Sequence, residues 1–136
     1  SFFKIVGKKK FIKYYQKITR KPFHIYNYSD YISEPLIEEN IDFEYFPTII
    51  PGWDNTPRAG INGVVIQNNT PELFKIMANR AVEKIREYPD DHKIIFIKSW
   101  NEWAEGNYLE PDQRFGHDFL KALSEAVKEG GLLDHD

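Results

Sequence analysis

Two glutamates, Glu102 and Glu105, stand three residues apart in the segment KIIFIKSWNEWAEGNYLEPD, residues 93–112. That spacing puts both side chains on one side of a helical turn or tight loop, and on opposite sides of a regular strand. Two carboxylates that face one cleft can divide labour, because one gives a proton while the other stays ionised as a base or nucleophile. Glycoside cleavage requires this division. The competing interpretation is two solvated loop residues.

Large aromatic side chains flank this carboxylate pair. Trp100 and Trp103 lie on either side of Glu102, and either could stack on a sugar or desolvate a glutamate. Asn101 and Gly106 complete a polar cluster directly after an apolar run. In parallel α/β proteins the carboxyl ends of the strands and the following loops form the binding face.

A second cluster of the same kind occurs in PGWDNTPR, residues 51–58, with Trp53, Asp54, Asn55 and Arg58. Sugars present apolar C–H faces and hydroxyl groups, so a sugar site needs an aromatic surface together with carboxylate, amide and guanidinium groups. The alternative is an ordinary turn with the tryptophan covering the core, because Pro-Gly and Asp-Asn pairs are common turn residues. The segment alone leaves both interpretations open.

Strands are expected just before each cluster. Ile94, Ile95, Phe96 and Ile97 predict a strand buried on both faces, and residues 41–50 predict another. Between them, Thr70-Pro71-Glu72 opens a helix that is expected to run to about Tyr88 and to end at Pro89. Its expected apolar face consists of Phe74, Met77, Ala81, Ile85 and Tyr88.

The other predicted elements are shorter or less distinct. Helices are expected over residues 9–18, from Ser29 or Ser33 to about Glu39, and over residues 116–128; a short strand is expected over residues 23–26. The last helix should bury Leu120, Leu123 and Val127 and end at Gly130-Gly131. The βαβα order predicts a parallel sheet with too few strands to close an eight-stranded barrel.

Composition fits one folded domain or a fragment of one. The chain has 136 residues, of which 41% are hydrophobic, and it opens without Met, which suggests a piece of something longer. No apolar run approaches a membrane span, and without cysteine there are neither disulfides nor thiolate metal sites. The four histidines show no metal-ligand spacing, and His24 is expected in the core or at its rim.

Charge is distributed unevenly along the chain. Residues 1–29 carry eight Lys or Arg and no acid, whereas the remainder carries a net charge of −11. A basic arm can hold phosphate, but a solvated helix face is the simpler interpretation. No nucleic-acid-binding motif occurs within it.

The motifs WDNTPR and KSWNEWAEGNYLEPD, followed by Phe115-Gly116 and a helix, resemble the WbsX-like glycosyltransferase family over residues 26–123. That family is related to glycoside hydrolase family 99, the endo-α-mannosidases. The resemblance implies the C-terminal part of a (β/α)₈ TIM barrel that acts on glycosidic bonds. It also implies a role near bacterial surface-polysaccharide and lipopolysaccharide synthesis, in the cytoplasm, with the periplasm as the alternative.

Residue roles follow from the same resemblance. The N-E-W-x-E-G motif of the mannosidases implies that Glu105 is the general acid/base and that Glu102 deprotonates the sugar 2-hydroxyl, which then attacks C1. Ala104 stands where the mannosidases usually have His, so the substrate or the reaction can differ. The N-terminal barrel strands are absent, so the fragment is expected to be inactive alone and to self-associate through its open edges. The expected substrate-binding residues are Trp53, Asp54, Asn55, Arg58, Trp100, Asn101, Trp103 and Tyr108.

Two other functions compete with glycosyl cleavage or transfer by the glutamate pair. The first is a nucleotide-sugar-dependent glycosyltransferase of O-antigen synthesis; its metal-dependent forms use a D-x-D motif, and the sole one here is Asp134-His135-Asp136 at the C-terminus. The second is a non-catalytic carbohydrate-binding module. The expected partner is a carbohydrate, with no nucleic acid, membrane span, metal or cofactor.

Overall fold

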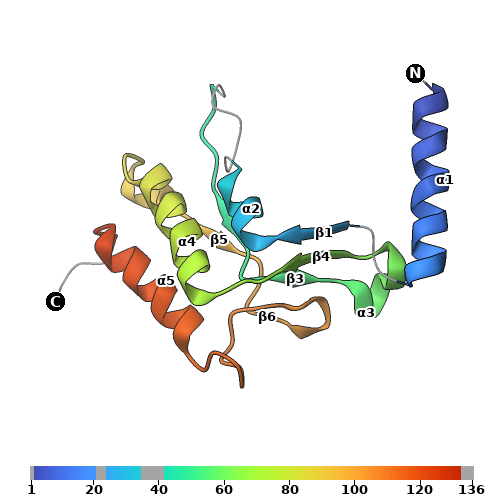
Figure 1. The fold of residues 1–136 in the computed structure, drawn as a ribbon. Coiled ribbons are helices and arrows are strands. Elements are labelled where there is room, and N and C mark those ends of the chain that lie inside the picture. Colours follow the sequence, from blue (N-terminus) through green and yellow to red (C-terminus); the bar gives the residue numbers. More distant parts are fainter. Residues whose placement is uncertain (1, 21–23, 35–41, 133–136) are drawn as a thin grey trace.

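The computed structural model describes residues 2–20, 24–34 and 42–132, with side chains described from residue 11 onward. Figure 1 shows a mixed α/β arrangement, with α4 and α5 side by side at one end and α1 at the other. The helices are α1 (Phe2–Thr19), α2 (Tyr28–Ser33), α3 (Thr56–Ala59), α4 (Pro71–Ile85) and α5 (Asp118–Glu129), with 3₁₀ turns η1 (Gly60–Asn62), η2 (Asp90–His92) and η3 (Trp103–Glu105). The strands are β1 (His24–Asn27), β2 (Thr48–Ile49), β3 (Trp53–Asp54), β4 (Val64–Gln67), β5 (Phe96–Ile97), β6 (Asn101–Glu102) and β7 (Asn107–Tyr108).

The strands form three small sheets. In the largest, of order β1-β4-β3, β4 is parallel to β1 and antiparallel to β3. Strands β2 and β5 pair in parallel with α4 between them in the chain, and β6 pairs with β7 as a hairpin. The parallel pairs confirm the α/β prediction. The antiparallel pairs were not anticipated, and within the described ranges no barrel closes.

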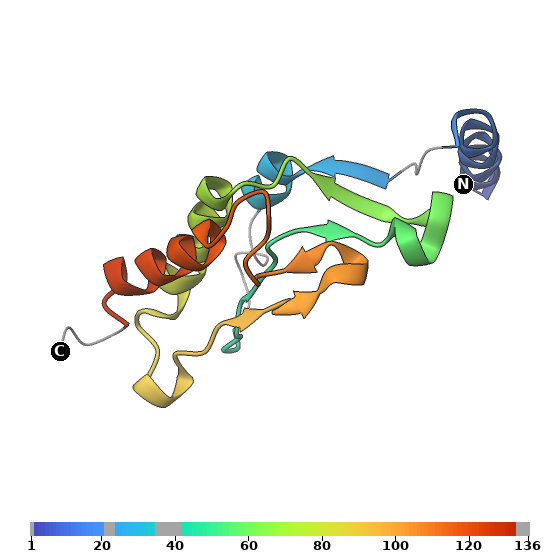
Figure 2. The same cartoon turned by 90° about the horizontal axis from the view of Figure 1, so that it is seen from below.

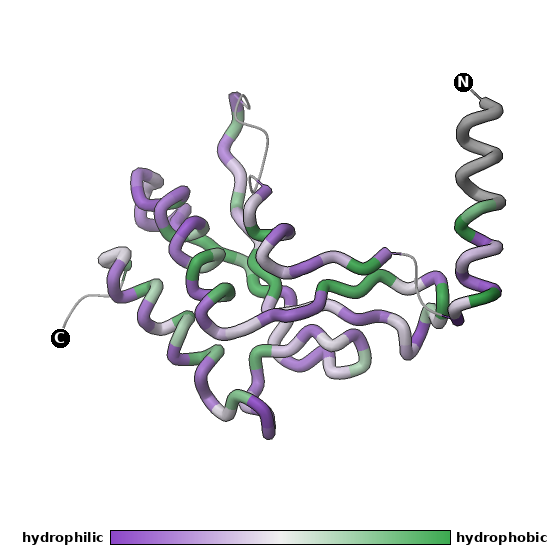
Figure 3. The backbone as a smooth tube through the Cα atoms, viewed as in Figure 1, coloured by the Kyte–Doolittle hydropathy of each residue, from purple (hydrophilic) through white to green (hydrophobic). Residues whose placement is uncertain are grey.

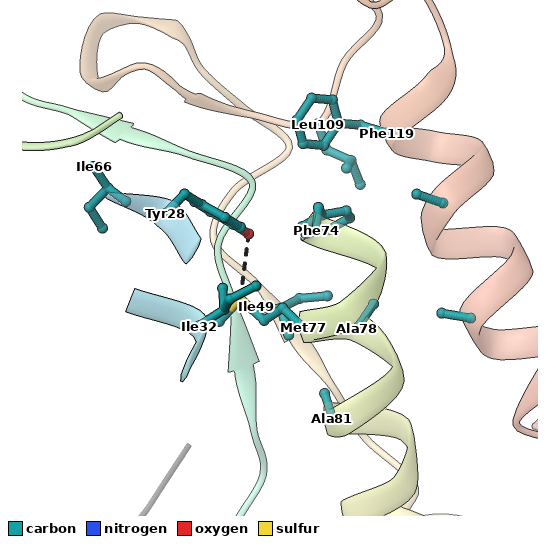
Figure 4. Close-up of a cluster of buried hydrophobic side chains, with 12 residues drawn as sticks. Tyr28, Ile32, Ile49, Ile66, Phe74, Met77, Ala78, Ala81, Leu109 and Phe119 are labelled. Carbon is teal, nitrogen blue, oxygen red and sulfur yellow. Dashed lines mark hydrogen bonds between the residues drawn. The ribbon is translucent and has the colours of Figure 1, made fainter. Parts of the chain in front are cut away.

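The core lies where α4 and α5 pack together against the strands (Figure 4). Thr70 caps α4 by accepting a hydrogen bond from the Leu73 amide at 3.3 Å, and Pro71 occupies the first turn, as expected. Hydrophilic and hydrophobic residues alternate along both helices (Figure 3). Four of the five residues expected on the buried face of α4 are buried: Phe74, Met77, Ala81 and Ile85. The fifth, Tyr88, lies beyond the end of the helix.

The buried face of α5 differs from the prediction. Phe119, Ala122 and Ala126 are buried, whereas Leu120 and Leu123 are only partly buried and pack at the margin of the cluster. Val127 is also only partly buried. Alanine has no large side chain to hold the helices apart, and the Phe119 ring lies 5.5 Å from that of Phe74. Close approach to α4 therefore selects small residues plus one aromatic rather than the leucines.

The strand expected to be buried on both faces is open on one of them. In β5, Ile97 packs against the core beside the fully buried Ile49 of its partner strand β2. On the other face Phe96 is 54% exposed, and the preceding Ile94 is also exposed. No described element covers that second face, so the prediction of two buried faces is wrong for this chain. Of residues 41–50 only β2 is a strand, and residue 41 lies outside the described ranges.

The N-terminal elements extend the sequence prediction. Helix α1 is longer than expected and lies at one end of the molecule (Figure 1), where its buried Gln16 donates a hydrogen bond to the Ile61 carbonyl of η1; its Phe11 and Ile18 are exposed. Helix α2 begins at Tyr28, so Ser29 and Ser33 lie within it rather than capping it. It ends at Ser33, followed by Glu34 in an extended conformation, and residues 35–39 of the expected helix lie outside the described residues. His24 is partly buried in β1. The described helices are too short or too polar to cross a membrane.

Tyr28 ties the core to the strands. Its side chain is fully buried, and its hydroxyl donates a hydrogen bond to the Ile50 carbonyl at 2.6 Å and approaches the Met77 sulfur at 3.5 Å. Burial, and secondarily the nearby Tyr31, raise the pKa of Tyr28 well above its usual value. The folded state therefore keeps the proton that the unfolded chain releases above about pH 10.

We predict that Tyr28→Phe lowers the free energy of unfolding at pH 7 by about 1–3 kcal/mol, because the Ile50 carbonyl loses its donor. The variant should also lose part of the fall in stability above about pH 10, because that fall arises from the raised pKa of the tyrosine. Urea denaturation at pH 7 and at higher pH measures both effects. Tyr14→Phe, at an exposed tyrosine, is the control and should change neither.

We predict that the isolated chain self-associates through the open face near β2 and β5, where Phe46, Ile94 and Phe96 are exposed. Light scattering should give a mass above that of a 136-residue monomer. Phe96→Asp should shift the distribution toward monomer, whereas a polar substitution at exposed Ile76 on α4 should not. A monodisperse wild-type monomer would contradict the prediction.

Candidate active site

The two polar clusters of the sequence meet in space. The β6–η3–β7 hairpin lies alongside β3 and α3 (Figure 2). Gly106 has a φ of +55°, and a Cβ there would come within 3.2 Å of the Asp54 Cβ and amide nitrogen. A Cβ on Gly52 would lie 2.9 Å from the Gly106 carbonyl oxygen. The two backbones therefore touch at positions where side chains do not fit.

An ion pair joins the two clusters across this contact. The Arg58 Nη1 atom, from α3, lies 3.0 Å from the Glu105 Oε1 atom, from η3. The Glu105 side chain is only 12% exposed, whereas that of Arg58 is 69% exposed. One partner is therefore fixed in the protein while the other is free to move into solvent.

Glu102 occupies a different environment. It lies at the end of β6, is partly buried, and pairs across the hairpin with Asn107. Its carboxylate forms no hydrogen bond or ion pair to any residue within the described ranges. The hairpin thus holds one paired and one unpaired glutamate three residues apart.

Asn107 connects the hairpin to the preceding segment through hydrogen bonds with Ser99. It is fully buried; its side-chain oxygen accepts a hydrogen bond from the Ser99 amide at 2.9 Å, and its carbonyl accepts one from the Ser99 hydroxyl at 2.9 Å. These bonds connect β7 to the chain leaving β5, and thereby fix where Glu102 and Glu105 lie. The Asn107 Nδ2 group has no partner among the described atoms.

Trp103 and Tyr108 form a stacked aromatic pair, with ring centroids 3.7 Å apart and planes 13° from parallel. The indole N–H of Trp103 donates to Glu110 at 2.7 Å, and the Tyr108 hydroxyl donates to Asp112 at 3.1 Å. Burial, followed by the Asp112 hydrogen bond, raises the pKa of Tyr108. Trp103 remains 48% exposed, so a fixed aromatic surface faces solvent beside Glu105.

The remaining expected substrate-binding residues are arranged differently. One Asp54 oxygen accepts hydrogen bonds from the Thr56 amide and hydroxyl, and the Asn55 oxygen accepts one from the Val64 amide at 2.8 Å. Both side chains thus stabilise the turn into α3, as the turn interpretation expected. The Lys98 ammonium lies 4.7 Å from the Trp53 ring centroid.

Trp100 and Asn101 are exposed at the start of the hairpin. The Trp100 carbonyl accepts hydrogen bonds from the Leu109 and Glu110 amides. The backbone of Trp100 therefore helps close the hairpin, while its indole remains on the surface.

The sequence interpretation missed the residues that support the hairpin, chiefly Asn107 and Glu110. A buried asparagine carries no sequence signature, whereas the acid-rich LEPD after the hairpin could have indicated partners for the two aromatic rings. An open groove of about 650 Å³ lies beside those rings, lined by Trp103, Tyr108, Pro111, Asp112, Gln113 and Arg114. Within the ranges that the structure covers, no three His, Asp or Glu residues gather as a metal site, and Asp134-His135-Asp136 lies outside those ranges.

Comparison with known proteins places this arrangement in a family. The family model described as Glycosyltransferase WbsX matches residues 2–123. Two proteins named Uncharacterized protein WxcX, from two strains of Xanthomonas campestris pv. campestris, are each 38% identical to the chain over 87 residues. The aligned segment is 63% of this chain and 12% of each relative, so the chain spans only a small part of their length.

No solved structure shows a significant match. The family match covers both polar clusters, the hairpin and the start of α5, and it reaches further toward the N-terminus than the motifs indicated. The chain therefore belongs to the WbsX glycosyltransferase family.

Proposed function

We propose that the full-length protein cleaves or transfers glycosyl groups of a polysaccharide, and that Glu105 and Glu102 carry the reaction. The observation that supports this most directly is the shielded Glu105 carboxylate, which is held by Arg58 beside the exposed face of Trp103. A sugar stacked on that ring would bring a glycosidic oxygen within reach of a positioned carboxyl group. Membership of a glycosyltransferase family supports a glycan substrate.

In the proposed reaction Glu105 donates a proton to the leaving glycosidic oxygen. Glu102, which has no partner among the described residues, takes the proton of the sugar 2-hydroxyl, and that oxygen attacks C1 as the glycosidic bond breaks. Glu105, now ionised, then removes a proton from water or an acceptor hydroxyl, which opens the anhydro-sugar at C1. Glu102 returns its proton to the 2-oxygen, so both glutamates end as they began.

Arg58 has a defined part in this cycle. A carboxyl group that has taken up a proton no longer attracts a guanidinium, so Arg58 leaves Glu105 before proton donation and returns afterwards. Its high exposure allows that movement without disturbing the core.

Transfer from a nucleotide sugar is the second candidate, because the matching family model carries the description of a glycosyltransferase. A metal-dependent transferase would hold the diphosphate through a divalent ion bound by carboxylates. The described residues contain no such group, so this candidate would need a metal-independent mechanism or residues elsewhere in the protein. A carbohydrate-binding module is separated from both by the test below.

We predict that Glu105→Gln lowers sugar release from mannans or bacterial surface polysaccharides by the full-length protein at least about a hundredfold. Amide nitrogen cannot act as a general acid, but the shape of the site is preserved, so substrate binding should survive. Glu87→Gln, at an exposed glutamate past the end of α4, is the matched control. Equal release by the variant would rule out an acid/base role, and glycan binding without turnover by the wild type would indicate a binding module.

We predict that Arg58→Ala lowers kcat about tenfold or more with a smaller effect on KM, because the ionised Glu105 that forms on proton donation loses the returning guanidinium that stabilises and positions it. Arg58→Lys should recover part of the activity, since it keeps the charge but not the fixed fork of donors. Steady-state kinetics on the same polysaccharide measures both. A pure KM effect would instead make Arg58 a substrate-binding residue.

A further inference from the structure

The groove beside the aromatic pair is a separate surface from the Arg58–Glu105 pair. Its lining combines two stacked rings with an amide, a carboxylate and a guanidinium: Trp103, Tyr108, Pro111, Asp112, Gln113 and Arg114. Its volume, about 650 Å³, falls within the range of small-molecule sites. Trp103 lines the groove and is also the first residue of η3, the turn that contains Glu105, so the groove and Glu105 share this turn.

The loop that forms one wall of this groove is fixed by its own hydrogen bonds. One Asp112 oxygen accepts from the Arg114 amide at 2.8 Å and the Phe115 amide at 2.6 Å, and Asp112 and Gly116 exchange backbone hydrogen bonds. Phe115 packs edge-on against Phe119 of α5, with ring centroids 5.4 Å apart. The wall therefore rests on the core rather than on a loose segment.

The two exposed polar side chains on this wall form no side-chain hydrogen bond to a described residue. The carboxylate oxygens of Asp112 accept hydrogen bonds from the loop amides and from the Tyr108 hydroxyl. By contrast, Gln113 and Arg114 are exposed, and the Arg114 guanidinium forms no ion pair with a described carboxylate; it lies 4.6 Å from the Phe115 ring centroid. An amide and a guanidinium beside aromatic surface are the groups that bind pyranose hydroxyls and C–H faces.

We propose that this groove is a subsite for a further pyranose residue of a polysaccharide, next to the sugar at the glutamate pair, with Arg114 and Gln113 binding its hydroxyls. The groove accordingly favours a chain of at least two sugars, and a monoglycoside would leave it empty. This inference rests on the proposed function for the position of the reacting bond. It adds two specificity-determining residues, neither of which belongs to the WDNTPR or N-E-W-x-E-G motifs.

The test compares Arg114→Ala and Gln113→Ala with wild type in the full-length protein. The substrates are oligosaccharides of increasing length from mannans and bacterial surface polysaccharides, and nitrophenyl monoglycosides that are too short to fill the groove. We expect kcat/KM on the longer oligosaccharides to fall about tenfold or more in Arg114→Ala, because a hydrogen bond to a charged group is lost, and to change less than twofold on the monoglycosides. An equal loss on short and long substrates, or no loss on either, would overturn the subsite.

Arg86→Ala is the matched control. Arg86 is an exposed arginine that forms an ion pair with Glu83, and neither residue lines the groove. A binding measurement separates this proposal from the proposed function. Tryptophan fluorescence monitors binding of the same oligosaccharides to the Glu105→Gln variant, with and without the Arg114→Ala or Gln113→Ala substitution. Binding that weakens in Arg114→Ala without any turnover by wild type would keep the subsite and refute catalysis. Binding that is unaffected by both substitutions would refute the subsite, whatever the activity.

Discussion

The contact between Gly106 and the Asp54 backbone is the constraint on which the candidate site depends. Asp54 and Gly106 lie in clusters about fifty residues apart. A Cβ on Gly106 would be tightly placed against Asp54, at 3.2 Å, and one on Gly52 would lie only 2.9 Å from the Gly106 carbonyl oxygen. A larger residue at Gly52 would require the backbones to shift, and one at Gly106 would in addition be strained at a φ of +55°. At this contact η3 lies against β3 and α3, which places Glu105 within ion-pair distance of Arg58.

Most polar groups near this contact are used to build it. Asp54, Asn55, Asn107 and Asp112 all accept hydrogen bonds from neighbouring backbone amides, which fixes the loops that carry the other side chains. The groups that remain accessible include the Glu102 carboxylate, the Arg58 guanidinium and the face of Trp103. A rigid frame around a few free groups is the arrangement that positioning a substrate requires.

The sequence was informative where local chemistry determines structure and misleading where distant packing does. The cap and apolar face of α4 follow from Thr70, Pro71 and a regular spacing, and these were predicted correctly. Strand β4 was missed although Val64, Val65 and Ile66 are β-branched residues that favour strands, because a run of four residues gives little periodicity; in the structure it pairs with β1 and β3. The buried face of α5 was displaced because alanines, which look neutral in a pattern, are what allow two helices to approach closely. The sequence analysis assigned residues of both clusters to substrate binding, but the close contact between the clusters involves two glycines that no periodicity reveals.

The unequal environments of the two glutamates bear on the order of events in the proposed reaction. In that reaction Glu105, which is shielded and ion-paired, becomes a proton donor only after Arg58 has moved. Glu102 can act as a base without any such movement, because it has no partner among the described residues. A sugar that enters over Trp103 can supply hydroxyl acceptors for the departing guanidinium, since Arg58 is already mostly in solvent. Substrate binding and the release of Glu105 would then be one step. In that case a compound that fills the space beside Trp103 but offers Arg58 no acceptor should bind without being turned over, because the ion pair would remain closed.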